Sequence, residues 1–148
     1  MKKKDLITSL KEELKLLEAA QSVLQDSYDS CKKTGIKKKY LRIELLEFEA
    51  LTSRFARTSD IFIQKILRLI DEIDREQFGS PRDRINRAEK KGVVKSAEKL
   101  IDIRDLRNKI AHEYSVNFIT DIFKDVLQHS AFLISCINQL KSYCKKYF

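Results

Sequence analysis

The chain has 148 residues, of which 43% are hydrophobic and 35% are charged, and its formal net charge is +8. This length and balance predict a single domain, spanning residues 1–148, with a real hydrophobic core, and they exclude an intrinsically disordered chain. Three glycines and one proline are too few for the many turns of a β-protein, so the composition favours long helices.

Apolar residues recur at three- and four-residue spacing along the first half of the chain, which predicts two long helices. The first is expected over residues 5–32, and Gly35 is a candidate left-handed cap at its end. The second is expected over residues 38–75, with an apolar stripe that starts at Leu41. Because this helix is long for a globular protein, a kink near residues 52–53 is a candidate feature.

The second half of the chain predicts three further helices. A short, mostly charged helix is expected over residues 81–91, with Ser80 as its N-cap and Gly92 after its end. The next is expected over residues 96–112, and the last should start at residue 117 or 120 and run toward residue 147. Together these elements predict an all-α fold, an up-and-down four-helix bundle with an extra short helix.

Residues with the chemistry to hold metals or cofactors form no known pattern. Cys31, Cys136 and Cys144 lack CxxC spacing, so we expect free thiols in a reducing cytoplasm. The sequence contains no Gly-rich phosphate loop and no carboxylate cluster typical of a metal site, so neither a metal nor a cofactor is expected. The most apolar window is too short to span a bilayer, and no membrane partner is expected.

The run from Arg107 to Tyr114, RNKIAHEY, combines residue types that suit metal-independent RNA cleavage. His112 could take the proton of a 2′-hydroxyl as that oxygen attacks the neighbouring phosphate. Arg107 offers a planar fork of donors to the phosphate oxygens. Asn108 could orient the imidazole or bind the phosphate, and Tyr114 could donate to the phosphate or stack on a base.

The spacing within this run constrains how such a site could form. Each residue of an ideal helix advances about 100° around the axis. Arg107 and Tyr114 then face the core, whereas Asn108 and His112 face nearly the opposite side. A straight helix therefore does not place Arg107 beside His112. We expect either that the helix ends or bends near Ala111, or that a second subunit supplies the missing residue across a two-fold axis.

A purely structural interpretation of the same residues is also open. Arg107 could pair with an inward carboxylate, and His112 could complement the negative end of its helix. Arg54 and Arg57 are candidate RNA contacts, because they lie three residues apart and could follow phosphates, although they could equally form a solvated basic face. Asp60 could orient a catalytic group from the second helix. The net charge is as compatible with RNA as with no polyanionic partner.

The octet Arg-Asn-x-x-Ala-His-x-Tyr resembles the signature of the HEPN domain, and its Arg-x4-His-x-Tyr form is similar to that of HepT-type toxins in type VII HEPN/MNT toxin–antitoxin pairs. Residues 48–57 are a weaker match to the second helix of such proteins. The resemblance implies an HEPN-like helical bundle that acts as a homodimeric, metal-independent endoribonuclease, with Arg107 and His112 catalytic. It further implies that a partner MNT nucleotidyltransferase transfers AMP to Tyr114 and so silences the toxin.

Two functions remain open at this point. The first is the RNase toxin, acting on RNA as its substrate. The alternative is a non-catalytic substrate-binding or docking subunit of a nucleotidyltransferase, in which the same motif would serve protein contact and nucleotide binding within a hetero-oligomer. A helical regulatory protein with no nucleotide role is a third reading, and it predicts no phenotype on changing His112.

Overall fold

The computed structural model describes residues 2–77, 79–112 and 116–148. These residues are helical apart from short connections and contain no strand, so the prediction of an all-helical chain is confirmed. The helices are α1 (Lys3–Thr34), α2 (Arg42–Ser59), the π-helix η1 (Asp60–Ile66), α3 (Leu67–Ile73), α4 (Pro81–Lys91), α5 (Ala97–His112), α6 (Val116–Cys144) and the 3₁₀-helix η2 (Lys145–Tyr147).

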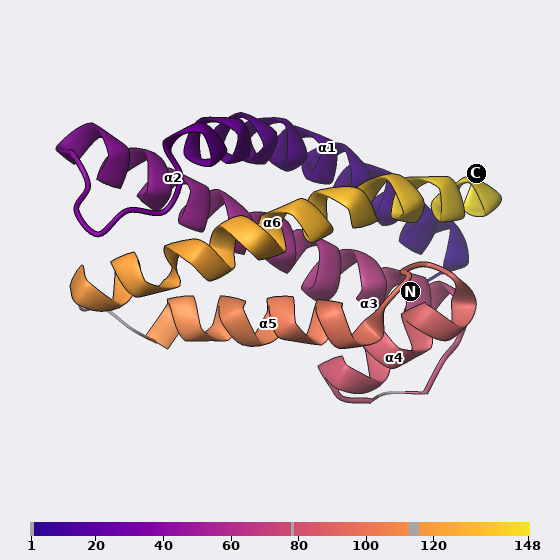
Figure 1. Ribbon diagram of the computed structural model, residues 1–148. Coiled ribbons are helices and arrows are strands. Elements are labelled where there is room, and N and C mark those ends of the chain that lie inside the picture. Colours follow the sequence, from indigo (N-terminus) through magenta and orange to yellow (C-terminus); the bar gives the residue numbers. More distant parts are fainter. Residues whose placement is uncertain (1, 78, 113–115) are drawn as a thin grey trace.

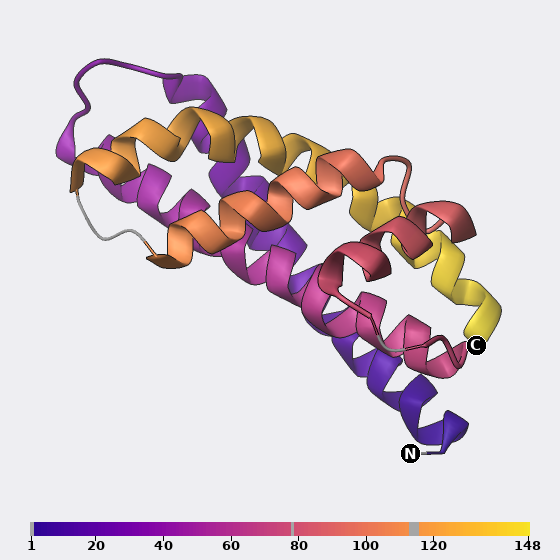
Figure 2. The ribbon, with the colours of Figure 1, turned by 90° about the horizontal axis from the view of Figure 1, so that it is seen from below.

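Four long helical segments run along the length of the molecule (Figures 1 and 2). Helix α1 forms one of them, α2, η1 and α3 together form a second, and α5 and α6 form the others. Helix α1 packs against α2, α3 and α6, and α5 packs against α2, α4 and α6. The short α4 lies near α3, at the end of the molecule opposite the α1–α2 connection. Among the residues described, no helix combines the length and apolarity needed to cross a membrane.

The core consists of large apolar side chains contributed by every long segment. Fully buried examples are Leu10, Leu17 and Leu24 of α1, Phe48, Phe55 and Phe62 of α2 and η1, Leu100 and Ile103 of α5, and Phe123, Leu133 and Ile137 of α6. The rings of Phe48 and Phe123 stack with their centroids 4.6 Å apart and join α2 to α6. Removing these side chains from water is the main stabilising contribution to the fold.

The connection between α1 and α2 differs from its prediction. Helix α2 begins at Arg42, four residues later than expected, and Leu41 precedes the helix with 66% of its surface exposed, so its place in the apolar stripe was wrong. Gly35 does end α1, and its N–H donates to the carbonyl of Cys31 at 2.8 Å. Its φ of 72° is positive as predicted, but its ψ of 175° is extended and not left-handed helical.

The irregularity in the second segment lies later than residues 52–53. Helix α2 continues unbroken through Thr52, whose hydroxyl donates to the carbonyl of Phe48 at 2.8 Å. The departure is η1, where the N–H of Leu67 donates to the carbonyl of Phe62, five residues earlier. A π turn is wider than an α turn and alters which side chains share a face. Asp60 is the first residue of this segment.

Helix α4 has the predicted bounds because its signals are local. The Ser80 hydroxyl accepts a hydrogen bond from the N–H of Asp83 at 3.2 Å, and the Asp83 carboxylate accepts one from the N–H of Ser80 at 3.0 Å. Gly92 ends the helix in the left-handed conformation. Helix α5 begins one residue later than expected, and α6 begins one residue before the earlier of its two predicted starts.

Candidate functional site on helix α5

Arg107 forms a two-pronged ion pair with Asp60, which joins α5 to η1. Its Nε donates to Oδ1 of Asp60 at 2.8 Å, and its Nη2 donates to Oδ2 at 2.9 Å. The Arg107 side chain is 27% exposed and that of Asp60 is 40% exposed, so the pair lies at the edge of the core. The purely structural interpretation expected Arg107 to pair with a carboxylate that faces the core. Asp60 is that carboxylate.

The ion pair fixes the guanidinium without using all of its donors. Hydrogen bonding to Asp60 raises the pKa of Arg107, while partial burial acts in the opposite direction. The Nη1 group makes no hydrogen bond to any described residue. A guanidinium carries donors on more than one edge, so one that is held by a carboxylate can also bind a second anion, such as a phosphate.

Asn108 and His112 lie on the outer side of α5, where both side chains are exposed. Helix α5 continues through Ala111 to His112, so no bend at Ala111 brings them to Arg107. Five residues of α-helix place His112 about 140° around the axis from Arg107. The described part of one chain therefore does not bring the two predicted catalytic side chains together. Tyr114 lies outside the described residues.

The two candidate RNA contacts on α2 occupy different environments. Arg54 is half-buried, and its Nη1 donates to the carbonyl of Val23 at 3.0 Å and to the hydroxyl of Ser27 at 2.7 Å. These bonds link α2 to α1, so the Nη1 group of Arg54 has a structural role. Arg57 is exposed. Their contact with RNA stays a prediction, and the geometry favours Arg57 as the more accessible of the two.

Sequence reasoning did not single out Arg104, which lies one helical turn before Asn108. Its Nε is buried and has no hydrogen-bond partner among the described residues. The spacing of four residues from Asn108, on a helix that already carried the motif, was the signal that could have identified it. Asp60, by contrast, was a candidate orienting residue in the sequence, and the structure places it against Arg107.

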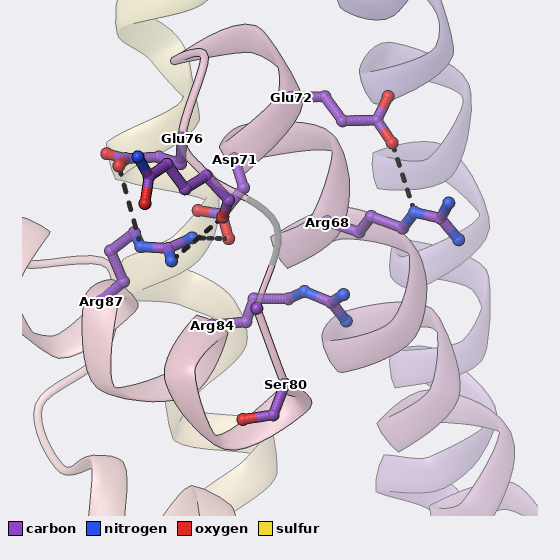
Figure 3. Close-up of a pocket in the computed structure, with 9 residues that line it drawn as sticks. Arg68, Asp71, Glu72, Glu76, Ser80, Arg84 and Arg87 are labelled. Carbon is purple, nitrogen blue, oxygen red and sulfur yellow. Dashed lines mark hydrogen bonds and ion pairs between the residues drawn. The ribbon is translucent and has the colours of Figure 1, made fainter.

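A pocket of about 40 Å³ lies between α3 and α4, away from the octet (Figure 3). It is lined by Arg68, Asp71, Glu72, Glu76, Gln77, Gly79, Ser80, Arg84 and Arg87. Its carboxylates are paired with cations: Arg87 lies 2.6 Å from Asp71 and 3.8 Å from Glu76, and Arg68 lies 3.2 Å from Glu72. The pairs of Arg87 link α4 to α3 and to the residue Glu76 that follows it, whereas the Arg68–Glu72 pair lies within α3, and no carboxylate of the pocket is left without a cation.

The described residues offer few other candidates for a metal site or a reactive thiol. No group of three or more His, Cys, Asp or Glu side chains is arranged to hold a metal ion there. The three cysteines are buried and form no disulfide. Residues 107–112 of α5 therefore combine the side chains best suited to catalysis in the part of the chain that the structure describes.

Comparison with known proteins gives no match: no protein-family model, no curated protein and no solved structure is similar to this chain. The resemblance of the octet to the HEPN signature therefore stays a prediction, carried by its residues alone.

Proposed function

We propose that this chain is an HEPN-type helical bundle and the RNase toxin of an HEPN/MNT toxin–antitoxin pair. The observation that carries the proposal is the Arg107-x4-His112 pair on α5. Asp60 orients the Arg107 guanidinium through Nε and Nη2 and not through Nη1, while the His112 imidazole is exposed at the end of the same helix. A fixed cation and an accessible imidazole are the two groups that metal-independent RNA cleavage needs.

The reaction is an internal transfer of the phosphoryl group. His112 accepts the proton of the 2′-hydroxyl while the 2′-oxygen forms a bond to phosphorus. The bond from phosphorus to the 5′-oxygen of the next nucleotide breaks, and that oxygen takes up a proton from a water molecule. The products are a 2′,3′-cyclic phosphate and a free 5′-hydroxyl. Arg107 stabilises the negative charge that gathers on the phosphate oxygens during attack.

The proposal includes a homodimer because one straight helix separates the two catalytic side chains by about 140°. In an isologous dimer, Arg107 of one subunit would act with His112 of the partner subunit, and the reverse pair would form a second, equivalent site. The exposure of Asn108 and His112 supports this arrangement, since both side chains are accessible to another chain. Bound RNA would lie across the two α5 helices.

Regulation by a nucleotidyltransferase completes the proposal. Transfer of AMP from ATP to the Tyr114 hydroxyl, with release of pyrophosphate and of the hydroxyl proton, would place a bulky, negatively charged group two residues after His112. Such a group would repel an RNA phosphate and block access to the imidazole. This step predicts a mass increase on Tyr114 when the chain is produced together with its partner enzyme.

The test is RNA cleavage by the purified chain in the presence of EDTA. Removing a general base costs about 10² to 10⁴ in rate, so His112→Ala should reduce cleavage by at least about a hundredfold. Arg107→Ala should reduce it comparably. His129→Ala is the matched control, because it removes the other histidine, a half-buried residue of α6, and should cleave like the wild type.

Undiminished cleavage by His112→Ala would remove the proposed general base. If no variant cleaves RNA, and the chain instead assembles tightly with a nucleotidyltransferase, the docking-subunit function is correct. Expression of the wild type and His112→Ala in a bacterial host provides a second readout, because only the wild type should arrest growth and degrade cellular RNA.

A further inference from the structure

We propose that Arg104 forms a second phosphate-binding site on α5, which holds an RNA phosphate beside the one that Arg107 contacts. The proposal rests on the proposed function in one respect, namely that single-stranded RNA lies along α5. It assigns a role in RNA binding to a residue outside the octet.

The position of Arg104 places it between the two halves of the motif. It lies about 60° around the helix from Arg107 and about 40° from Asn108, in the sector that separates them. Along the axis it precedes Asn108 by about 6 Å, one helical turn. Exposed Ala111 occupies the same sector one turn after Arg107, and its small side chain leaves the surface open there. Arg104 thus extends the polar surface of α5 without a gap.

The side chain of Arg104 is held in place but weakly paired. It is 24% exposed, and its Nε is buried with no hydrogen-bond partner in the described part of the chain. Its ion pair is with the adjacent Asp105, where Nη1 lies 3.8 Å from Oδ1, too far for a hydrogen bond. Asp105 is half exposed and also faces Nη2 of Arg82 at 3.7 Å. Arg104 therefore contrasts with Arg107, whose hydrogen bonds to Asp60 are short.

The chemistry of this guanidinium fits a phosphodiester. Partial burial of a cation without good hydrogen bonds is unfavourable, and a bound phosphate would supply acceptors to the Nη groups, although not to the buried Nε. Packing of the aliphatic stem limits the motion of the guanidinium, so little conformational entropy is lost when a phosphate binds. The exposed amide of Asn108 lies one turn away and can bind the same strand. Successive phosphates of one RNA strand would then contact Arg104 and Arg107.

The test measures RNA affinity separately from cleavage. Binding of a fluorescent single-stranded RNA is followed by anisotropy in a His112→Ala background, so that the RNA is not cut. Arg104→Gln should weaken binding about tenfold, the loss expected for one charge-assisted hydrogen-bonded contact. The slope of log K against log salt concentration should fall by about 0.7, the value for one phosphate contact on a single strand.

Arg82→Gln is the matched control, because it removes the same charge and the other cation facing Asp105, from a side chain that is 60% exposed. It should change the affinity by less than about twofold. Equal losses in both variants, or no loss in Arg104→Gln, overturn the proposal. Arg104→Lys, which keeps the charge but not the fork, should bind with intermediate affinity, and it provides the comparison if Arg104→Gln does not fold.

The outcomes also separate this inference from the proposed function. If the wild type cleaves RNA while the Arg104→Gln protein binds RNA undiminished, the inference fails and the RNase function stands. If RNA binding depends on Arg104 but the wild type does not cleave, the binding site stands and the RNase function fails. Absence of RNA binding by every variant and by the wild type overturns both.

Discussion

Arg107 and Asp60 are 47 residues apart in sequence, yet their side chains meet through two parallel hydrogen bonds of 2.8 and 2.9 Å. The pair links the helix that carries the octet to the π-helical segment of its neighbour. Both side chains keep part of their surface in water. The arrangement orients a guanidinium at the protein surface and is not a buried ion pair of the core.

Because the pair is partly exposed, we predict that it contributes modestly to stability. A double-mutant cycle with Asp60→Asn and Arg107→Met should give a coupling free energy of about 0.5 to 1 kcal/mol. The measurement is urea unfolding followed by circular dichroism. A coupling of several kcal/mol would show that the pair is a core element, and it would weaken the case for a surface guanidinium poised to bind phosphate.

Arg54 should matter more to stability than Arg57, although both lie on α2. Arg54→Met removes the hydrogen bonds to the carbonyl of Val23 and the hydroxyl of Ser27 and leaves both acceptors near the α1–α2 interface. The expected loss is about 1 to 2 kcal/mol in the free energy of unfolding. Arg57→Met, on an exposed side chain, should stay within about 0.5 kcal/mol of the wild type. Similar values for the two variants would contradict the structural role of Arg54.

Substitutions at the ends of α4 and α3 should change the free energy of unfolding in opposite directions. Gly92 ends α4 with a φ of 84°, and Arg75 follows α3 with a φ of 59°, a conformation that favours glycine. A Cβ built on Gly92 meets no described residue within 4 Å apart from its chain neighbours, so Gly92→Ala tests backbone strain alone and should cost about 1 kcal/mol. Arg75→Gly should relieve strain and gain up to about 1 kcal/mol, reduced by the greater freedom of glycine in the unfolded chain. Thermal unfolding of both variants measures the difference, and a loss in Arg75→Gly would contradict it.

The buried thiols predict that stability falls at high pH. Burial raises the pKa of Cys31 and Cys136 from 9.0 to about 11, and that of Cys144 from 9.0 to about 12. Above pH 9 the unfolded chain therefore releases thiol protons that the folded chain retains, so the free energy of unfolding decreases as the pH rises from 9 toward 11 or 12.

Tyrosines and lysines also titrate in this range, so the informative quantity is a difference between two proteins. Cys144→Ala removes one thiol, and its unfolding free energy should fall less steeply with pH than that of the wild type. The two slopes should differ by up to about 1.4 kcal/mol per pH unit between pH 9 and 11. Identical slopes would mean that the Cys144 thiol titrates alike in both states.

Features set by neighbouring residues could be predicted from the sequence. The bounds of α4 follow from Ser80, Pro81 and Gly92, which act within one helical turn of the positions they define. The start of α2 was misplaced because Leu41 fits the apolar spacing yet lies before the helix. The π segment carries no proline or glycine to mark it, and the apolar stripe continues across it, so spacing alone did not reveal the change of helix type.

The candidate site could be predicted only in part, because its contacts are tertiary. The opposite orientation of Arg107 and His112 follows from helix periodicity. The choice of Asp60 as the partner of Arg107 depends on how α5 packs against η1, which no local pattern encodes. The hydrogen bonds from Arg54 to α1 could not be predicted for the same reason, since their acceptors precede Arg54 by 27 and 31 residues.

The winding of η1 affects where the charged side chains of α2 and α3 lie relative to one another. A π turn accommodates one more residue than an α turn, and one residue of α-helix corresponds to about 100° of rotation. If the same residues wound as an ordinary α-helix, α3 would turn by about 100° relative to α2, and the core side chains of the two helices would no longer share a face. Asp60, the first residue of η1, would keep its place relative to α2, whereas the carboxylates of α3 would turn with that helix. The backbone of η1 therefore acts as the spacer that sets the register between two helices.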